Sequence, residues 1–170
     1  MTELNARRAT DAAPVTTLIL HRRRRAWRFE GTDRDAWLRT WHGMHHGEIQ
    51  VADRSWSVGV TDRRRIGVVA RTGDRPVVLL DPRQAQVPGP GGPVRWAPHW
   101  HHGSLTRDAA RIHVQLSAWP RGRVRIDVTG AWPELELVAL TAAFALLTRR
   151  HRRMVMMMAV AGAIGHGPVG

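Results

Sequence analysis

The sequence contains no cysteine, which excludes a disulfide framework, a thiol nucleophile, a thiolate metal site and haem attached through cysteine. Lysine and tyrosine are absent too, so all 26 basic residues are arginine. Together with abundant alanine, glycine, proline and valine, this usage is typical of a GC-rich coding sequence. The formal net charge of +12 therefore reflects codon usage as well as any need for an anionic partner.

Motifs of catalysis are also missing. There is no GxSxG elbow around a serine, no GxxxxGK loop for phosphates, and no carboxylate pair in a recognisable pocket. The glycines of residues 88–93 lack the strand-then-helix context that a phosphate-binding loop needs. The sequence therefore favours a non-enzymatic binding module, and we predict no cofactor.

The N-terminal region lacks the features of a secretory signal. Arg7 and Arg8 are not followed by an apolar region of about 7–15 residues, because residues 18–20 run directly into a histidine and four arginines. We expect a cytoplasmic protein, and the charge leaves a peripheral membrane location open. Residues 1–16 are polar and aperiodic, so we interpret them as a flexible N-terminal arm that precedes a single domain at residues 17–153.

Alternation of apolar and polar residues runs through most of this domain, and a period of two predicts half-buried strands. The clearest alternation lies at residues 112–116 and 124–128, which a turn at residues 120–122 joins as a hairpin. The polar run at residues 62–65 predicts another turn, followed by a returning strand that starts at Ile66. Further strands are predicted around Trp27 and Phe29, Ile49 and Val51, Trp56 to Val60, and residues 76–80.

Two segments depart from this pattern. Residues 33–44 fit either a short helix or a strand, because Trp37, Trp41 and Met44 also have helical spacing. Residues 86–93 contain three prolines and three glycines, so neither helix nor strand can persist there. We predict an exposed loop for the second segment and leave both alternatives open for the first.

The strongest local prediction is a helix from Pro133 to about Arg150. Proline suits the first helical position, and glutamates in the first turn with arginines in the last complement the helix dipole. Residues 137–147 have only Thr141 as a polar interruption, and a helix that is apolar on all sides must be surrounded. This stretch rises about 16 Å, short of the roughly 30 Å hydrocarbon core, so we expect protein around it. The residues predicted to be buried are Val138, Leu140, Phe144 and Leu147.

Many short strands followed by one all-apolar helix predict a mainly β domain, an antiparallel barrel or strongly curved sheet with one buried C-terminal helix. The last strand would be RVRIDVTG at residues 123–130 and the threaded helix LELVALTAAFALL at residues 135–147. In this order of elements the chain resembles the tubby C-terminal-like group, which includes the LURP-one-related proteins and the phospholipid scramblases. The resemblance covers residues 18–153, beyond which residues 154–170 form an apolar tail.

The resemblance implies a non-catalytic domain, with lipid-headgroup binding in some relatives, and it carries no binding residue over to this chain. The residues themselves offer two basic runs as candidate anion-binding sites. On a strand, alternate arginines face opposite sides, so at most two of the first run can address one surface. A solvated face that discourages strand pairing is the alternative for both runs. The candidate residues are Arg22, Arg23, Arg24, Arg25, Arg63, Arg64 and Arg65.

These observations predict a module that binds an anionic membrane surface, and nucleic-acid binding is the alternative. A nucleic-acid domain would add exposed aromatic rings for stacking, and Trp27 is the candidate, although its alternation with Phe29 points it inward. A second alternative is a histidine-rich metal scaffold, since neutral imidazole binds zinc and copper. No spacing matches a known metal motif, so we predict no metal site. The histidine clusters are His42, His45 and His46, and His99, His101 and His102.

Overall fold

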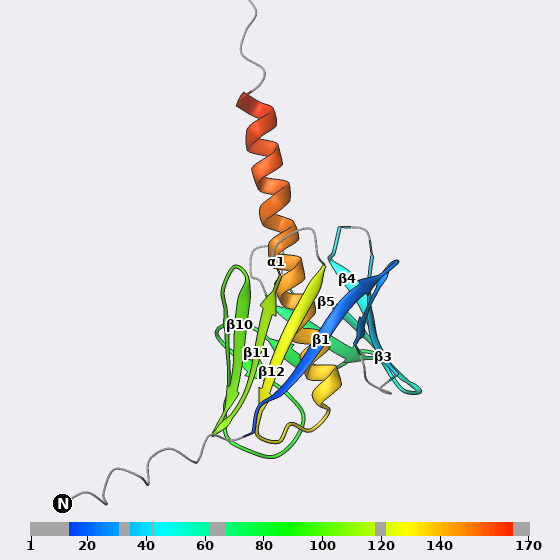
Figure 1. The fold of residues 1–170 in the computed structure, drawn as a ribbon, viewed down its shortest axis with the longest axis vertical. Coiled ribbons are helices and arrows are strands. Elements are labelled where there is room, and N and C mark those ends of the chain that lie inside the picture. The colour runs from blue at the N-terminus through cyan, green and yellow to red at the C-terminus, as the bar shows by residue number, and fades with distance from the viewer. Residues whose placement is uncertain (1–13, 31–34, 42, 62–66, 118–121, 165–170) are drawn as a thin grey trace, which may run out of the picture.

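The computed structural model describes residues 14–30, 35–41, 43–61, 67–117 and 122–164. Within these ranges the chain forms twelve β-strands and one α-helix (Figure 1). They are β1 (Thr16–Arg23), β2 (Ala26–Phe29), β3 (Ala36–Thr40), β4 (His46–Val51), β5 (Arg54–Val60), β6 (Val68–Thr72), β7 (Arg75–Leu80), β8 (Ala85–Gln86), β9 (Val94–Pro98), β10 (His102–Arg107), β11 (Ala110–Leu116), β12 (Arg123–Thr129) and α1 (Leu135–Ile164).

The strands form a closed antiparallel barrel. Each strand pairs with its neighbours in sequence, and β12 pairs with β1 to close the barrel. The closing register sets Thr16 opposite Val128 and His21 opposite Arg123. Closure pairs the strand edges that an open sheet would expose. The predicted β fold with a buried C-terminal helix is therefore confirmed, and the barrel is the form that it takes.

The core lies between the inner face of the barrel and the first half of α1, which runs through its centre (Figure 1). Val138, Leu140 and Phe144 are completely buried and Leu147 is 6% exposed, as the sequence predicts. Burial of each large apolar side chain contributes about 1.5–3 kcal/mol. The helix is apolar on all sides here because strands surround it on all sides.

Glycine makes room for the helix at one point of the wall. A Cβ atom on Gly47 of β4 would lie 2.6 Å from the backbone oxygen of Arg39 and 3.3 Å from the ring of Phe144. The missing side chain therefore allows both close pairing of β3 with β4 and close approach of the Phe144 ring. A larger residue at Gly47 would have to displace one of them.

The helix extends well beyond its predicted end. It begins at Leu135, two residues after the predicted start at Pro133, and continues to Ile164 instead of ending near Arg150. The arginines expected in the last turn therefore lie in the middle of the helix. The prediction was wrong because the methionines, alanines and valines that follow carry no helix-breaking signal, and the single Gly162 costs about 1 kcal/mol. In the described part of the chain, no helix has both the length and the apolar composition to span a membrane.

The segment with two alternatives contains a strand, β3, which pairs with β2 and β4. Pairing on both sides outweighs the helical spacing of its tryptophans, because a gap here would open the barrel. The proline- and glycine-rich loop predicted at residues 86–93 is irregular from Val87 onward, whereas Gln86 belongs to β8 and Val87 is buried. The buried guanidinium of Arg107 holds the loop in place. Arg107 donates hydrogen bonds to the carbonyls of Val87, Pro88 and Pro90. The predicted turns at residues 62–65 and 120–122 lie largely outside the described residues.

Candidate functional site

The basic run at residues 22–25 forms the tip of the β1–β2 hairpin. β1 ends at Arg23, Arg24 and Arg25 form the turn, and all four arginines are exposed. Arg24 has a φ of 55°. This left-handed conformation costs a residue with a side chain about 1–2 kcal/mol. The second predicted run, Arg63, Arg64 and Arg65, lies outside the described residues.

A row of basic side chains crosses three neighbouring strands beside this tip. His21 of β1 lies opposite Arg28 of β2 and opposite Arg123 of β12 in the antiparallel register. Arg23 follows on the same face of β1, because alternate residues of a strand face the same side. Arg28 and Arg123 thus lie on either side of His21, and their two positive charges favour an anion placed between them.

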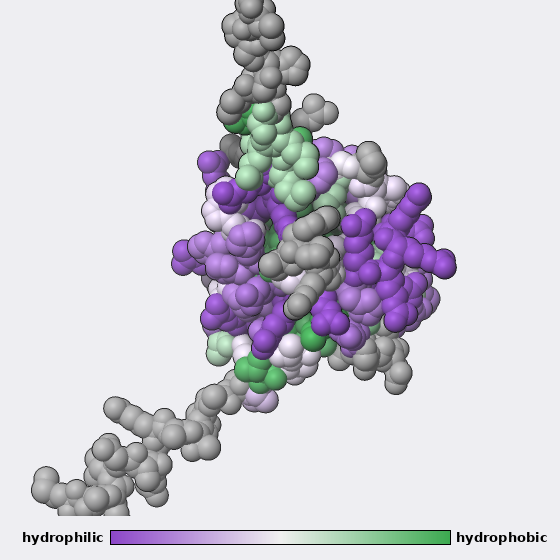
Figure 2. Space-filling model, turned by 45° about the horizontal axis from the view of Figure 1, so that its top comes forward, coloured by the Kyte–Doolittle hydropathy of each residue, from purple (hydrophilic) through white to green (hydrophobic). Residues whose placement is uncertain are grey.

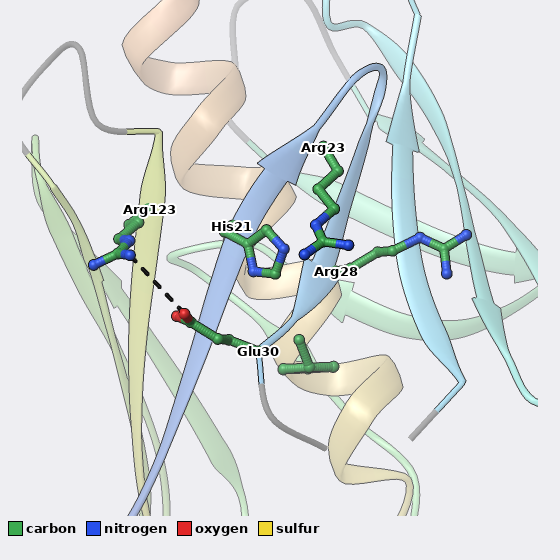
Figure 3. Close-up of a pocket in the computed structure, with 6 residues that line it drawn as sticks. His21, Arg23, Arg28, Glu30 and Arg123 are labelled. Carbon is green, nitrogen blue, oxygen red and sulfur yellow. Dashed lines mark ion pairs between the residues drawn. The ribbon is translucent and has the colours of Figure 1, made fainter. Parts of the chain in front are cut away.

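The row lines a depression of about 490 Å³ on the outer wall of the barrel (Figure 3). One acidic residue, Glu30, also lines the depression, and its Oε1 lies 3.9 Å from Nη2 of Arg123. Both side chains are about half exposed, at 58% for Arg123 and 47% for Glu30, so the pair is weak. Three arginines and one glutamate leave the depression positive. Its lining residues are His21, Arg23, Arg28, Phe29, Glu30 and Arg123.

The ring of His21 carries a buried nitrogen. Its Nδ1 is buried and has no hydrogen-bond partner within the described residues. A buried polar atom left without a partner costs about 1–3 kcal/mol, so such atoms are uncommon in folded proteins. Because this nitrogen is not exposed, the N–H groups of the neighbouring guanidinium groups are the donors that an anion in the depression can reach.

A second group of arginines lies on α1 where the helix leaves the barrel. Arg150 donates a hydrogen bond of 3.0 Å to the carbonyl of Ser117. The guanidinium carbon of Arg153 lies 3.9 Å from the centroid of the Trp100 ring. Burial, followed by the charge of Arg152, lowers the pKa of Arg149. We call Arg149, Arg150, Arg152 and Arg153 the arginine collar.

The hairpin tip and the arginine collar lie at the same end of the barrel. The backbone N–H of Arg22 donates to the carbonyl of Gly122, and Arg150 donates to that of Ser117, at the two ends of the β11–β12 connection. The hydroxyl of Thr148 donates to the carbonyl of Met44 in the β3–β4 connection. Figure 2 shows that much of the barrel surface from which the helix rises is hydrophilic. This end therefore concentrates positive charge.

The described members of the histidine clusters form no metal site. No three histidine or acidic side chains of the described residues are placed to hold a metal ion. His42 lies outside the described residues, and His45 and His46 are exposed. The rings of His99 and His102 stack on each other, with centroids 4.6 Å apart. His99 and His102 thus contact each other between the end of β9 and the start of β10.

His113 on β11 extends this row of rings along the outer wall. Its Nδ1 lies 3.0 Å from the hydroxyl oxygen of Ser104, and its centroid lies 5.6 Å from that of His102. Burial, followed by the positive charges of Arg111 and His102, lowers the pKa of His113. A neutral imidazole at this position fits a residue of the barrel wall that forms a hydrogen bond with Ser104.

Sequence reasoning identified the hairpin tip but missed His21, Arg28 and Arg123. Each stands next to one or two apolar residues in an alternating strand, so nothing local distinguishes it from any other outward-facing residue. The alternation of apolar and polar residues could have shown only that each of the three faces outward. The register that sets the three side by side joins strands at opposite ends of the sequence.

Comparisons with known proteins add no identification. No protein-family model, no curated protein and no solved structure matches this chain. The likeness to the tubby C-terminal-like group stays a prediction, because a barrel around a helix does not by itself identify a family.

Proposed function

We propose that this protein is a non-enzymatic module that binds anionic lipid surfaces through the arginine-rich end of its barrel. The observation that carries the proposal is the row of Arg28, His21 and Arg123 along one depression, next to the exposed hairpin tip. Guanidinium groups bind phosphate oxygens through paired hydrogen bonds. The lipid-headgroup binding that the tubby-like resemblance implies supports the same ligand class.

Several arginines at one end act together on a charged surface. Each basic side chain close to an anionic leaflet contributes about 1 kcal/mol. The hairpin tip and the arginine collar lie at the same end, so a membrane facing that end would attract both. A small soluble anion would contact the depression alone. The further arginines of the hairpin tip and the collar would contact only an extended surface, so we favour a membrane as the ligand.

Nucleic-acid binding is the competing function. The aromatic ring closest in sequence to the hairpin tip, Trp27, is 6% exposed and so is not placed to stack on a base. A basic surface can still bind DNA or RNA by releasing counterions, with an affinity that falls steeply as salt rises. Comparison of vesicles with duplex and single-stranded nucleic acid at one salt concentration separates the two functions.

Co-sedimentation with phosphatidylcholine vesicles of increasing phosphatidylserine content tests the proposal. We expect binding to rise with the acidic lipid content and to exceed binding to nucleic acid at moderate salt. The double variant Arg28→Gln/Arg123→Gln should lower the partition coefficient about tenfold to thirtyfold, since it removes two cations from the surface. Binding that does not respond to acidic lipid would contradict the proposal.

A matched control removes the same charge from the other end of the barrel. Arg75 begins β7 and Arg95 lies on β9, both exposed and both near the end at which α1 enters. The double variant Arg75→Gln/Arg95→Gln should retain vesicle binding within about twofold, because its net charge changes equally but far from the surface. An equal loss in both double variants would indicate nonspecific attraction by net charge.

A further inference from the structure

Beyond the arginine collar, α1 leaves the barrel and exposes an apolar surface. Every residue of the segment Met154–Ala161 is exposed, including Met156 and Met158 at 67% and Val160 at 61%. The green helix in Figure 2 rises clear of the barrel. Apart from Val15, Trp41 and Trp100, the large apolar side chains exposed among the described residues all belong to this segment. An apolar surface of this kind marks a binding site.

The apolar surface covers all sides of the helix. The segment Met154–Ala161 spans more than two turns without a polar side chain, so every direction around the axis presents methionine, valine or alanine. A partner helix or a protein groove would cover one stripe and leave the rest in water. Lipid acyl chains surround a helix completely, so they match this pattern better than a second protein surface.

The base of the segment carries the residues that prefer a membrane interface. Trp100 is 57% exposed and Trp41 is 51% exposed. Trp100 stacks with Arg153 of the collar, and Trp41 lies in the connection that Thr148 binds. Tryptophan rings favour the headgroup level, and arginines there pair with anionic phosphates. The positive charge that complements an anionic membrane is thus present where the exposed apolar part of the helix begins.

The length of the segment matches one leaflet. From Met154 to its end at Ile164 the helix rises about 16 Å, at about 1.5 Å per residue. The hydrocarbon core of a bilayer is about 30 Å thick, so one leaflet contributes about 15 Å. The helix can therefore reach the middle of the bilayer while the arginine collar stays among the headgroups.

We infer that the helix from Met154 to Ile164 inserts into one leaflet of an anionic bilayer and holds the barrel upright on its surface. This inference rests on the proposed lipid binding and adds its mode: an apolar anchor surrounded by cations. The first half of α1 is the core of the barrel, so the anchor is rigidly joined to the domain. Insertion fixes the orientation in which the hairpin tip meets the headgroups.

The absence of cysteine provides a clean test by site-specific labelling. Met157→Cys creates a single thiol on the segment for the fluorophore NBD, and Ser55→Cys places the same label on the exposed wall near the opposite end. With phosphatidylcholine and phosphatidylserine vesicles that contain acyl-brominated lipid, we expect strong quenching at position 157 and little at position 55. Binding without quenching at 157 would overturn the insertion while leaving the proposed surface binding in place.

A charged substitution gives the second test. Met157→Asp should lower the vesicle partition coefficient about tenfold to a hundredfold, because a carboxylate is costly in hydrocarbon. Ser55→Asp, with the same charge change on the wall, should bind nearly as wild type. The residual binding of Met157→Asp should still require acidic lipid, whereas loss of vesicle binding by the wild type itself would reject the proposed function.

A second copy of the chain is the other partner that the exposed apolar segment could bind, and these tests must distinguish it from lipid. In analytical sedimentation without lipid, the wild type and Met157→Asp should have the same oligomeric state. A stable wild-type dimer that Met157→Asp dissociates, together with an unquenched label at position 157, would assign the segment to a second copy of the chain and overturn the inference. Melting curves of each variant should match the wild type, since the segment lies outside the barrel.

Discussion

Gly103 of β10 faces the indole of Trp96 on the neighbouring strand β9 so closely that a Cβ atom would lie 2.6 Å from Cη2 of the ring. Trp96 is 2% exposed and is among the largest buried side chains of the core. Its Nε1 has no hydrogen-bond partner within the described residues. The absence of a side chain at Gly103 is therefore what allows the six-membered part of this ring to approach the wall.

Gly103→Ala should lower the free energy of unfolding by about 1–3 kcal/mol, because the methyl group overpacks against Trp96. Urea denaturation measures the change. In a Trp96→Phe background, which removes no hydrogen bond seen in the structure, the same substitution should cost clearly less. Equal costs in both backgrounds would show that the ring is not the obstacle.

Two truncations should divide α1 into a structural and a dispensable part. A chain that ends at Trp132 loses the helix from the barrel, and burial worth about 10 kcal/mol or more goes with it, comparable to the whole stability of a domain. We expect no cooperative unfolding transition by circular dichroism. A chain that ends at Arg153 keeps the buried half and should melt within a few degrees of the full chain. Cooperative melting of the shorter chain would contradict the role of the helix as core.

Arg24→Gly should separate binding from stability at the hairpin tip. Glycine adopts the left-handed conformation of this residue without strain, so the free energy of unfolding should rise by about 0.5–1 kcal/mol. Loss of one cation should weaken vesicle binding about fivefold. Arg24→Ala is the control, with the same loss of binding and no gain in stability. Unchanged binding in both variants would mean that the tip does not meet the membrane.

Stability should fall when the solution becomes mildly acidic. Burial, followed by the charges of Arg111 and His102, holds the pKa of His113 in the folded protein below its ordinary value of 6.5. Between that value and the lower folded pKa, the unfolded chain binds the proton more readily, so unfolding becomes easier as pH drops. Urea denaturation across this range should give a pH slope that His113→Gln reduces. If His113→Gln left the pH dependence of the unfolding free energy unchanged, the loss of stability would have to come from other histidines.

Much of the fold could be read from local patterns. Alternation in a strand depends on neighbouring residues, so Trp27 and Phe29 could be assigned to the core before any tertiary contact was known. The same holds for the run around Phe144, whose apolar residues require surroundings on every side. The strand at residues 36–40 could not be decided in this way, because its spacing fits two structures and pairing with β2 and β4 selects one.

The sequence alone determined that this chain builds alternating strands around an apolar helix and that it carries arginine in excess, since both follow from residue order and composition. The tertiary structure alone decided which basic residues lie side by side. His21 meets Arg123 through strand register, and no local pattern records that pairing. It also decided that α1 is buried around Phe144 and exposed around Met157, because two stretches of equal apolar character differ only in whether the barrel is long enough to enclose them.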